Sequence, residues 1–332
     1  MNPVVDPAAR QQVLVFRPLP PDQLARLQAV HDVTVADPRD GAQRLAFDGV
    51  LAAAHGLIGS SYPFDAHLLA RAPKLKVISS VSVGVDNYDL ATLRARGITL
   101  CHTPGVLTET TADTIFALIL ATSRRVVELA NYVRDGHWTG NIGEPLFGRD
   151  VHGKTLGLLG FGRIGQAVAR RAALGFSMPV LFVNRSEVDV AAAAPDLLGK
   201  ALQRPLDEVL AQSDIVVAVL PLNPQTWRLM DAAAFARMKP GAIFINGARG
   251  AIVVEDALLQ ALNDGHLQAA GLDVFATEPL PPDSPLRTHA RVTALPHVGS
   301  ATVETRHAMA EMATTNLLNV LAGQAPLAAF EG

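Results

Sequence analysis

The sequence predicts an α/β protein made of two doubly wound parallel-sheet domains. Short apolar runs alternate with helical patterns along most of the chain, which is typical of parallel strands covered by helices. One run ends in a glycine-rich turn that leads into a helical pattern, and a length of 332 residues suits two domains better than one core. Hydrophobic residues form 49% of the chain and charged residues 18%, as in a compact globular protein.

The first array of strands and helices extends from about residue 13 to residue 107. Its expected strands are Val13–Phe16, a short strand region bracketed by Gly49–Leu51 and Gly56–Gly59, Lys76–Val81 and Ile98–His102. Helical patterns lie at Asp22–Val30 and Tyr88–Arg96. After a break at Thr103–Gly105, a long helical pattern extends from Thr108 to about Asp135, and its first residues are typical of helix caps.

The second array begins at Lys154 and has six expected strands, the number in a complete doubly wound dinucleotide fold. They are Leu156–Leu159, Val180–Val183, Ile215–Val219, Ala242–Ile245, Ala269–Leu272 and Val292–Ala294. The expected helices are Ile164–Leu174, Leu206–Gln212, Ala232–Met238 and Val254–Asp264, with a surface helix or loop at Ala191–Ala194. A last helix, Thr302–Leu321, is expected to return to the first array. The predicted domains are therefore residues 1–107 with 302–332, and residues 108–301.

The glycine-rich turn has the spacing of a dinucleotide-binding fingerprint. Gly160 permits a tight turn, Gly162 lets the backbone approach a pyrophosphate, and Gly165 lets the next helix pack on the strand. A helix that begins at Arg163 would direct its free N–H groups and its positive dipole end at the phosphates. The cofactor-binding residues expected in this turn are Phe161, Gly162, Arg163 and Ile164.

The residues after the second strand of this array indicate which cofactor is used. Enzymes that use NAD usually have an Asp or Glu here, which binds the ribose 2′-hydroxyl, whereas this chain has Asn184, Arg185 and Ser186. A carboxylate would repel a 2′-phosphate, while a guanidinium can bind it and a hydroxyl can donate to it. The sequence therefore predicts NADP(H) as the preferred cofactor over NAD(H). In the alternative interpretation, Arg185 is only a solvated loop residue.

Three residues with suitable chemistry each follow one of the last three expected strands. They are Arg249, Glu278 and His297. Because the carboxyl ends of parallel strands meet at one edge of a sheet, these side chains can converge beside the nucleotide. Each has a simpler interpretation. Arg249 could be only a loop cation, Glu278 a surface carboxylate, and His297 a strand-end histidine that is hydrogen-bonded to the backbone. Their common position favours a catalytic site.

Composition excludes several other classes of function. The net charge is −3 without a basic run, which argues against nucleic-acid binding, and the single cysteine, Cys101, fits a reducing compartment. Residues 1–12 lack the apolar segment of a signal peptide, and the apolar pattern Thr114–Thr122 is too short to cross a bilayer. The ten histidines form no metal-binding helical pair, so no metal is expected. We expect a cytoplasmic protein that binds neither membrane nor nucleic acid.

Several long motifs accompany the glycine-rich turn, at residues 82–87, 103–113, 246–250, 271–279 and 296–302. In these motifs, and over nearly its whole length, the chain resembles the D-isomer-specific 2-hydroxyacid dehydrogenases. Within that family it looks most like the bacterial glyoxylate/hydroxypyruvate reductases that also reduce 2-ketoaldonates such as 2-ketogluconate.

The resemblance implies a fold and a set of site residues. The first domain would be a flavodoxin-like substrate domain and the second an NAD(P)-binding Rossmann domain. The catalytic residues would be Arg249, Glu278 and His297, and the backbone of Val83 and Gly84 would hold the substrate carboxylate. Further cofactor contacts would come from Thr111, Leu220, Pro221, Gly247, Ala248, Arg249, His297 and Gly299, with Asp273 orienting the nicotinamide. The region 108–145 would form the arm of a homodimer.

The implied activity is NADPH-dependent reduction of glyoxylate, hydroxypyruvate or 2-ketogluconate to a D-2-hydroxy acid. Arg249 can bind the carboxylate and polarise the carbonyl, and His297, supported by Glu278, can act as general acid. Trp138 would reach the partner subunit's substrate pocket or pack in its own subunit, and Ser61 would bind a hydroxylated tail or lie in an ordinary turn. The alternatives are an NAD(H)-sensing co-repressor or scaffold of the same fold, a 3-phosphoglycerate dehydrogenase and a formate dehydrogenase.

Overall fold

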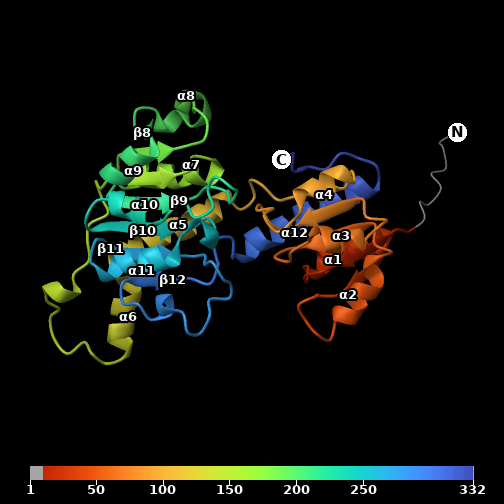
Figure 1. The fold of residues 1–332 in the computed structure, drawn as a ribbon, viewed down its shortest axis with the longest axis horizontal. Helices are drawn as coiled ribbons and strands as arrows, with labels where there is room; N and C mark the ends of the chain where they lie inside the picture. Colours follow the sequence, from red (N-terminus) through yellow and green to blue (C-terminus); the bar gives the residue numbers. More distant parts are fainter. Residues whose placement is uncertain (1–9, 332) are drawn as a thin grey trace. The chain divides into compact units, whose positions relative to one another are not determined.

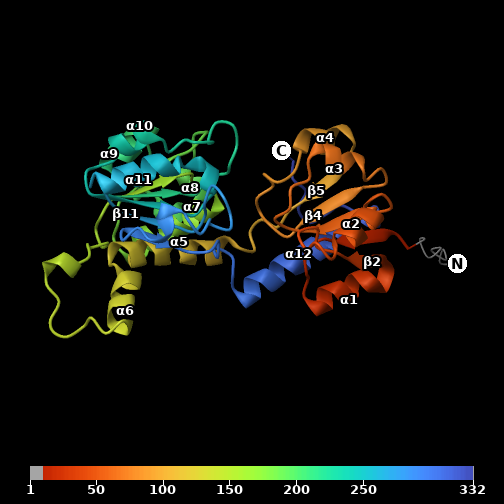
Figure 2. The same ribbon diagram turned by 60° about the horizontal axis from the view of Figure 1, so that its bottom comes forward.

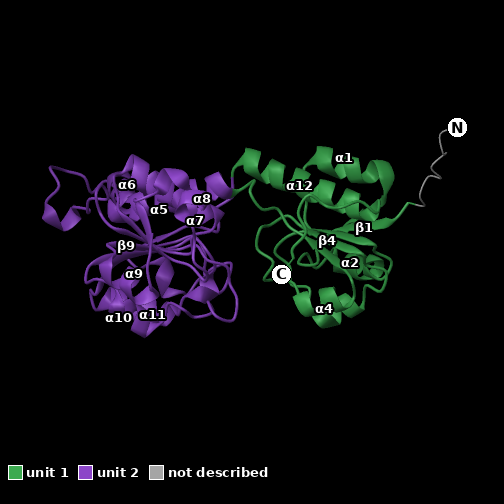
Figure 3. Cartoon of the chain, turned by 90° about the horizontal axis from the view of Figure 1, so that it is seen from above, with its two compact units in different colours: residues 1–107, 302–332 green, residues 108–301 purple. Residues whose placement is uncertain are grey.

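A computed structural model describes residues 10–331 of the chain. The chain divides into two compact units, residues 1–107 with 302–332 and residues 108–301 (Figure 3). Each unit is built on a parallel sheet with helices on both faces, which confirms the predicted fold class. Within the described residues, no helix combines the length and the apolar character that crossing a bilayer requires.

The first unit has five parallel strands in the order β2-β1-β3-β4-β5 (Figure 1). They are β1 Gln12–Val15, β2 Asp32–Val35, β3 Gly56–Gly59, β4 Val77–Ser80 and β5 Thr99–Cys101. Helices α1 Pro21–Val30 and α12 Val303–Leu321 cover one face, and α2 Arg44–Leu51, α3 Ala66–Ala70 and α4 Leu90–Ala95 cover the other (Figure 3). This strand order is that of the flavodoxin-like doubly wound fold.

The first unit differs from the prediction at β2, at α2 and at α3, a short helix that was not predicted. The edge strand β2 was not predicted, because its four residues are exposed or half-buried and give no apolar pattern. The strand expected in the region bracketed by Gly49–Leu51 and Gly56–Gly59 is Gly56–Gly59 itself, while Gly49–Leu51 ends helix α2, in which Phe47 and Leu51 point to the core four residues apart. The last residues cover the edge of β5, where Phe330 N–H donates to the carbonyl of Leu100 at 2.7 Å.

The second unit has seven parallel strands in the order β12-β11-β10-β9-β6-β7-β8. They are β6 Leu156–Leu159, β7 Val180–Val183, β8 Ala201–Gln203, β9 Ile215–Ala218, β10 Ala242–Asn246, β11 Leu267–Leu272 and β12 Val292–Ala294. One face carries α5 Thr108–Ser123, α7 Arg163–Arg170 and α8 Val190–Ala193, and the other carries α9 Leu206–Gln212, α10 Ala232–Arg237 and α11 Glu255–Asn263 (Figure 3). The order reverses between β6 and β9, which makes their carboxyl ends the switch point where such folds bind nucleotides.

The second unit also differs from the prediction. A seventh strand, β8, was missed because it is a three-residue edge strand in which only Ala201 is buried. The predicted long helix from Thr108 to Asp135 is two helices, α5 and α6 Val126–Arg134, separated by Arg125 in the left-handed conformation at φ 55°. The carbonyl of Ser123 at the end of α5 accepts Arg149 N–H at 2.8 Å, so the returning chain closes the first helix. Helix α7, which begins at the fingerprint turn, continues from Arg171 as a π-helical turn, Arg171–Gly175.

Close packing of the fingerprint helix explains one of its glycines. A Cβ on Gly165 would lie 2.4 Å from the carbonyl oxygen of Gly160, whereas a Cβ on Gly162 would meet no atom within 4 Å. Gly165 is therefore required by the contact of α7 with the strand. No contact within the protein requires a glycine at position 162. The space beside Gly162 is therefore open to a ligand.

We expect Gly165→Ala to lower the free energy of unfolding by about 3 kcal/mol, because backbone must move to admit the methyl group. Gly162→Ala is the matched control and should change stability by less than about 1 kcal/mol. Denaturant unfolding followed by circular dichroism measures both. Equal stability of the two variants would contradict this account of the turn.

Candidate active site at the strand ends of the second unit

The side chains of Glu278 and His297 form a hydrogen-bonded pair. His297 follows β12, Glu278 lies in the loop after β11, and Nδ1 of His297 is 2.7 Å from Oε2 of Glu278. The other oxygen, Oε1, accepts the N–H of Phe275 at 3.0 Å. Because Nδ1 is occupied, Nε2 is the ring nitrogen available to a reacting group, and the side chain of His297 remains 46% exposed.

The carboxyl group of Glu278 is held in its charged form. Its partial burial by itself would raise the pKa, but the hydrogen bonds from His297 and from the Phe275 N–H outweigh this. The positive charge of Arg249 acts in the same direction, so the pKa of Glu278 lies below its ordinary value. An ionised carboxylate beside an imidazole favours the protonated ring.

Arg249 is brought to this pair by a close approach of two loops. A Cβ on the next residue, Gly250, would lie 1.8 Å from the carbonyl carbon of Phe275, so only glycine lets the loop after β10 touch the loop after β11. Arg249 is half-buried, and its Nη1 donates to the carbonyl of Ala248 at 2.9 Å. The Asn246 side chain donates to the Arg249 carbonyl at 3.0 Å and fixes the backbone of this loop.

A buried carboxylate fixes the backbone that follows His297. Asp273 is 3% exposed, and its two oxygens accept the N–H groups of Val298 at 2.7 Å and Gly299 at 2.8 Å. His297 itself has a φ of 55°, a left-handed conformation that costs free energy in a residue with a Cβ. Burial raises the pKa of Asp273, and the two hydrogen bonds only partly oppose this rise. Asp273 therefore holds His297 in a strained turn.

Helix α5 packs against the same loops. A Cβ on Gly299 would lie 3.1 Å from Oδ2 of Asp273 and 3.3 Å from Cγ2 of Thr111, and one on Gly247 would lie 2.5 Å from Cγ1 of Ile115. The structure thus brings Thr111, Gly247, Asp273 and Gly299 together, and Thr111 is 8% exposed.

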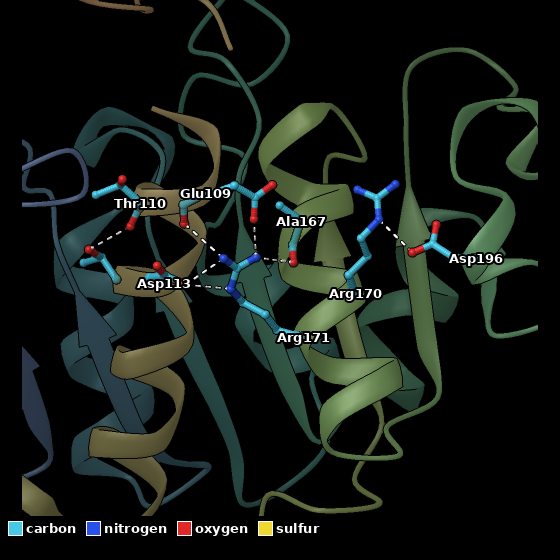
Figure 4. Close-up of polar contacts among 8 residues, drawn as sticks. Glu109, Thr110, Asp113, Ala167, Arg170, Arg171 and Asp196 are labelled. Carbon is cyan, nitrogen blue, oxygen red and sulfur yellow. Dashed lines mark hydrogen bonds and ion pairs between the residues drawn. The ribbon is translucent and has the colours of Figure 1, made fainter. Parts of the chain in front are cut away.

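Arg171, which sequence reasoning missed, ties α5 to the fingerprint helix. Its guanidinium lies 2.9 Å from Oε2 of Glu109 and 2.6 Å from Oδ1 of Asp113, and it donates to the carbonyl of Ala167 at 2.9 Å (Figure 4). Only 24% of the Arg171 side chain is exposed. No signal in the sequence could have found this contact, since Arg171 and Asp113 are 58 residues apart.

The glycine-rich turn fits a dinucleotide phosphate. Gly160 has a φ of 105°, and no side chain caps the first N–H groups of α7. Phe161 is only 2% exposed and its ring stacks on Phe182 with centroids 3.8 Å apart, so only its backbone can face a ligand. Ile164 is half-buried and Arg163 is exposed. The space beside Gly162 and the free N–H groups suit a pyrophosphate.

The remaining predicted cofactor residues lie at the ends of β7 and β9. Arg185 and Ser186 are exposed, and the Asn184 side chain donates to the Ser186 carbonyl at 3.2 Å. A Cβ on Gly160 would lie 3.1 Å from Cβ of Leu220, so the β9 loop adjoins the fingerprint turn. Pro221, next in that loop, is exposed.

The predicted substrate residues outside this group are Val83, Gly84, Ser61 and Trp138. In the first unit, the Val83 carbonyl lies 3.1 Å from Nδ1 of His102, and Gly84 N–H donates to Oγ of Ser82 at 3.1 Å. Ser61 is exposed, with a φ of 56°. In the second unit, Trp138 is 62% exposed.

Metal ligands do not gather anywhere in residues 10–331. Within that range there is no group of three or more His, Cys, Asp or Glu side chains that could hold a metal ion.

Comparison with known proteins identifies the family. The model of the "D-isomer specific 2-hydroxyacid dehydrogenase, NAD binding domain" matches residues 116–299. The chain is 49% identical over 318 residues to glyoxylate/hydroxypyruvate reductase B of Shigella boydii serotype 4, an alignment that covers 95% of this chain and 96% of the relative. It is also 48% identical over 318 residues to the enzyme of that name from Escherichia coli strain SMS-3-5, with the same coverage of 95% and 96%.

Two solved structures are similar over almost the whole chain. The TT0316 protein of Thermus thermophilus has a TM-score of 0.87 and 45% identity, covering 96% of this chain and 99% of that one. The NADPH-dependent glyoxylate/hydroxypyruvate reductase of Sinorhizobium meliloti, in complex with NADP and malonate, has a TM-score of 0.86 and 31% identity, covering 97% of each chain. The match to the family model, the identity of close to one half and the shared fold lead to one conclusion: the chain belongs to the D-isomer-specific 2-hydroxyacid dehydrogenases.

Proposed function

We propose that the protein reduces small 2-keto acids to D-2-hydroxy acids with NADPH. The observation that carries the proposal is the 2.7 Å pair of His297 and Glu278 beside Arg249, at the strand ends of a dinucleotide-binding sheet. Relatives that are 48% to 49% identical are named glyoxylate/hydroxypyruvate reductases, which supports glyoxylate and hydroxypyruvate as substrates. We include 2-ketogluconate as a third candidate, on the basis of the sequence motifs.

The residues of the second unit would hold the cofactor. The free N–H groups at the start of α7 and the space at Gly162 would take the pyrophosphate, and Arg185 with Ser186 would take the 2′-phosphate. Thr111, Asp273 and Gly299 would face the nicotinamide end. When bound, the reduced nicotinamide supplies a hydride. The S. meliloti relative was solved with NADP, which supports this cofactor.

In the proposed mechanism, Arg249 binds the substrate carboxylate and polarises the adjacent carbonyl. His297 donates the proton on Nε2 to the carbonyl oxygen as the hydride reaches the carbonyl carbon, which gives the alcohol. The Glu278 carboxylate stabilises the imidazolium before transfer and fixes the ring through Nδ1. Proton transfer from a positioned group of this kind is worth about 10²–10⁴-fold in rate.

The first unit would supply backbone groups for the substrate carboxylate. We assign this role to Val83 and Gly84, which lie just past the carboxyl end of β4. The Gly84 N–H now donates to Ser82 Oγ at 3.1 Å and would exchange this partner for a carboxylate oxygen. Ser61, exposed after β3, would bind a hydroxylated tail.

The proposed activity is tested by NADPH oxidation, followed by absorbance, with glyoxylate, hydroxypyruvate and 2-ketogluconate. We expect turnover with at least one of them and a lower KM for NADPH than for NADH. Arg185→Ala should raise the KM for NADPH about tenfold, because a charge-assisted contact is lost, and leave that for NADH unchanged. A wild-type preference for NADH would contradict the assignment of the cofactor, and no turnover would contradict the activity.

The roles of His297 and Arg249 can be tested by truncation. We expect His297→Ala and Arg249→Ala each to lower kcat/KM by at least about 10²-fold, because the proton donor or the substrate-binding cation is lost. NADPH binding, measured by nucleotide fluorescence, should stay nearly unchanged. Wild-type turnover in either variant would remove that residue from the mechanism.

Glu278→Gln tests the role of the carboxylate through the pH dependence of reduction. The pKa of Glu278 is lowered, so its charge is present at neutral pH and is lost only as pH falls through that pKa. Reduction needs a protonated ring, and the amide removes the charge that stabilises it. The wild-type rate should therefore fall as pH drops through the lowered pKa of Glu278, whereas Glu278→Gln, which carries no charge at any pH, should lack this acid limb and turn over more slowly at neutral pH. An acid limb in the variant like that of the wild type would show that the limb does not come from Glu278.

We also propose a homodimer formed through the region 108–145. Helix α6 buries none of its residues, and α6 and the segment after it extend away from their sheet (Figures 1 and 2). The exposed apolar side chains of α6 and of the segment that follows it are Val126, Val127, Val133, Trp138, Ile142 and Phe147, the last of which lies just beyond residue 145. Exposed apolar side chains concentrated in one segment of the chain are typical of an interface. In the dimer, Trp138 would reach the partner subunit's substrate pocket.

Sedimentation equilibrium tests the dimer. We expect a dimer for the wild type and dissociation for Val133→Lys, because a charge would enter the apolar surface. Leu45→Lys is the matched control, since Leu45 is 84% exposed in the first unit and lies outside the region. A monomeric wild-type protein would remove both the dimer and the shared role of Trp138.

A further inference from the structure

The loop after β7 is held in shape by a side chain from the neighbouring strand. Gln203, the last residue of β8, accepts the N–H of Val188 on Oε1 at 2.9 Å and donates from Nε2 to the carbonyl of Ser186 at 3.0 Å. The Asn184 amide donates to the same carbonyl at 3.2 Å. Gln203 thus uses both ends of its amide to fix the segment that contains Arg185.

Strand register places a second guanidinium beside this loop. Phe182 pairs with Gln203, and Arg204 N–H donates to the Phe182 carbonyl at 2.8 Å, so Arg204 lies next to the end of β7. Its Nη1 donates to the Gln203 carbonyl at 2.8 Å, and its Nε lies 3.7 Å from Glu208. The side chain is 42% exposed, and a guanidinium has five N–H donors, so most donors remain available to a ligand.

Three carboxylates lie in or near the loop, and two of them have partners elsewhere, whereas Glu187 is an exposed residue of the loop itself. Asp189 accepts the N–H groups of Ala191 and Ala192 and so caps helix α8. Glu208 is 48% exposed, and at 3.7 Å from Arg204 it forms a solvated pair that a phosphate can displace. A phosphate carries more charge than a carboxylate and can accept bidentate hydrogen bonds from a guanidinium.

We propose that the carboxyl end of β8, through Gln203 and Arg204, is part of the site that selects NADPH over NADH. Gln203 positions the loop so that Arg185 and Ser186 present their side chains to the 2′-phosphate, and Arg204 supplies a second guanidinium from the adjacent strand. This inference rests on the NADPH preference proposed above, since the 2′-phosphate is the only group that distinguishes the two cofactors.

The test measures binding of adenosine 2′,5′-bisphosphate and adenosine 5′-monophosphate by titration calorimetry, without turnover. Arg204→Gln should weaken binding of the bisphosphate about fivefold to tenfold and leave that of the monophosphate unchanged. Gln203→Met keeps the length of the side chain, removes both hydrogen bonds to the loop and should weaken bisphosphate binding about threefold. The effect of Arg204→Gln should shrink as salt is raised.

Arg237→Gln is the matched control. Arg237 also lies in the second unit, is 52% exposed and sits 3.6 Å from Asp207, so its loss should leave the binding of both nucleotides unchanged. If Arg204→Gln and Gln203→Met bind the bisphosphate like the wild type while Arg185→Ala does not, this inference is wrong and the NADPH preference stands. If the wild type binds both nucleotides equally, the preference itself is wrong.

Discussion

The hydrogen bonds from the backbone to the buried carboxylate of Asp273 are the constraint on which the candidate active site depends. Burial raises the pKa of this group, so its charge is costly in the folded protein. Two N–H groups, at 2.7 Å and 2.8 Å, offset part of that cost and bend the chain directly after His297. The left-handed backbone of His297 follows from this bend, and the bend directs the imidazole to Glu278. The buried charge of Asp273 thus stabilises the left-handed backbone conformation of His297, which would otherwise be unfavourable.

Glycines allow the strand-end loops to meet around this centre. Gly250 permits backbone contact between the loops after β10 and β11, and Gly247 permits contact between the first of these loops and α5. A methyl group at either position would overlap existing atoms, so the separation of Arg249 from Glu278 is set by backbone packing rather than by flexible side chains. The same helix α5 is held to the fingerprint helix by Arg171 (Figure 4).

Local sequence signals were sufficient for several local features of the fold. The buried strand Leu156–Leu159, the glycine turn and the position of chemistry-bearing residues after strand ends follow from short patterns, and the structure has all three. The edge strands β2 and β8 were missed because exposed or half-buried residues leave no apolar periodicity. The break at Arg125 depends on Arg149, which returns to the end of α5 from farther along the chain. The role of Gln203 was not apparent either, because its partners become neighbours only when β7 and β8 pair.

The proposed division of roles follows from this geometry. His297, Glu278, Arg249 and the dinucleotide turn all belong to the second unit, where one parallel sheet fixes the order in which their loops emerge. The distance between proton donor and cofactor site is therefore set by strand register inside a single core. Under the proposed mechanism, sequence changes in the loops of the first unit would leave the pair of His297 and Glu278 in place, because that pair is held by contacts within the second unit alone.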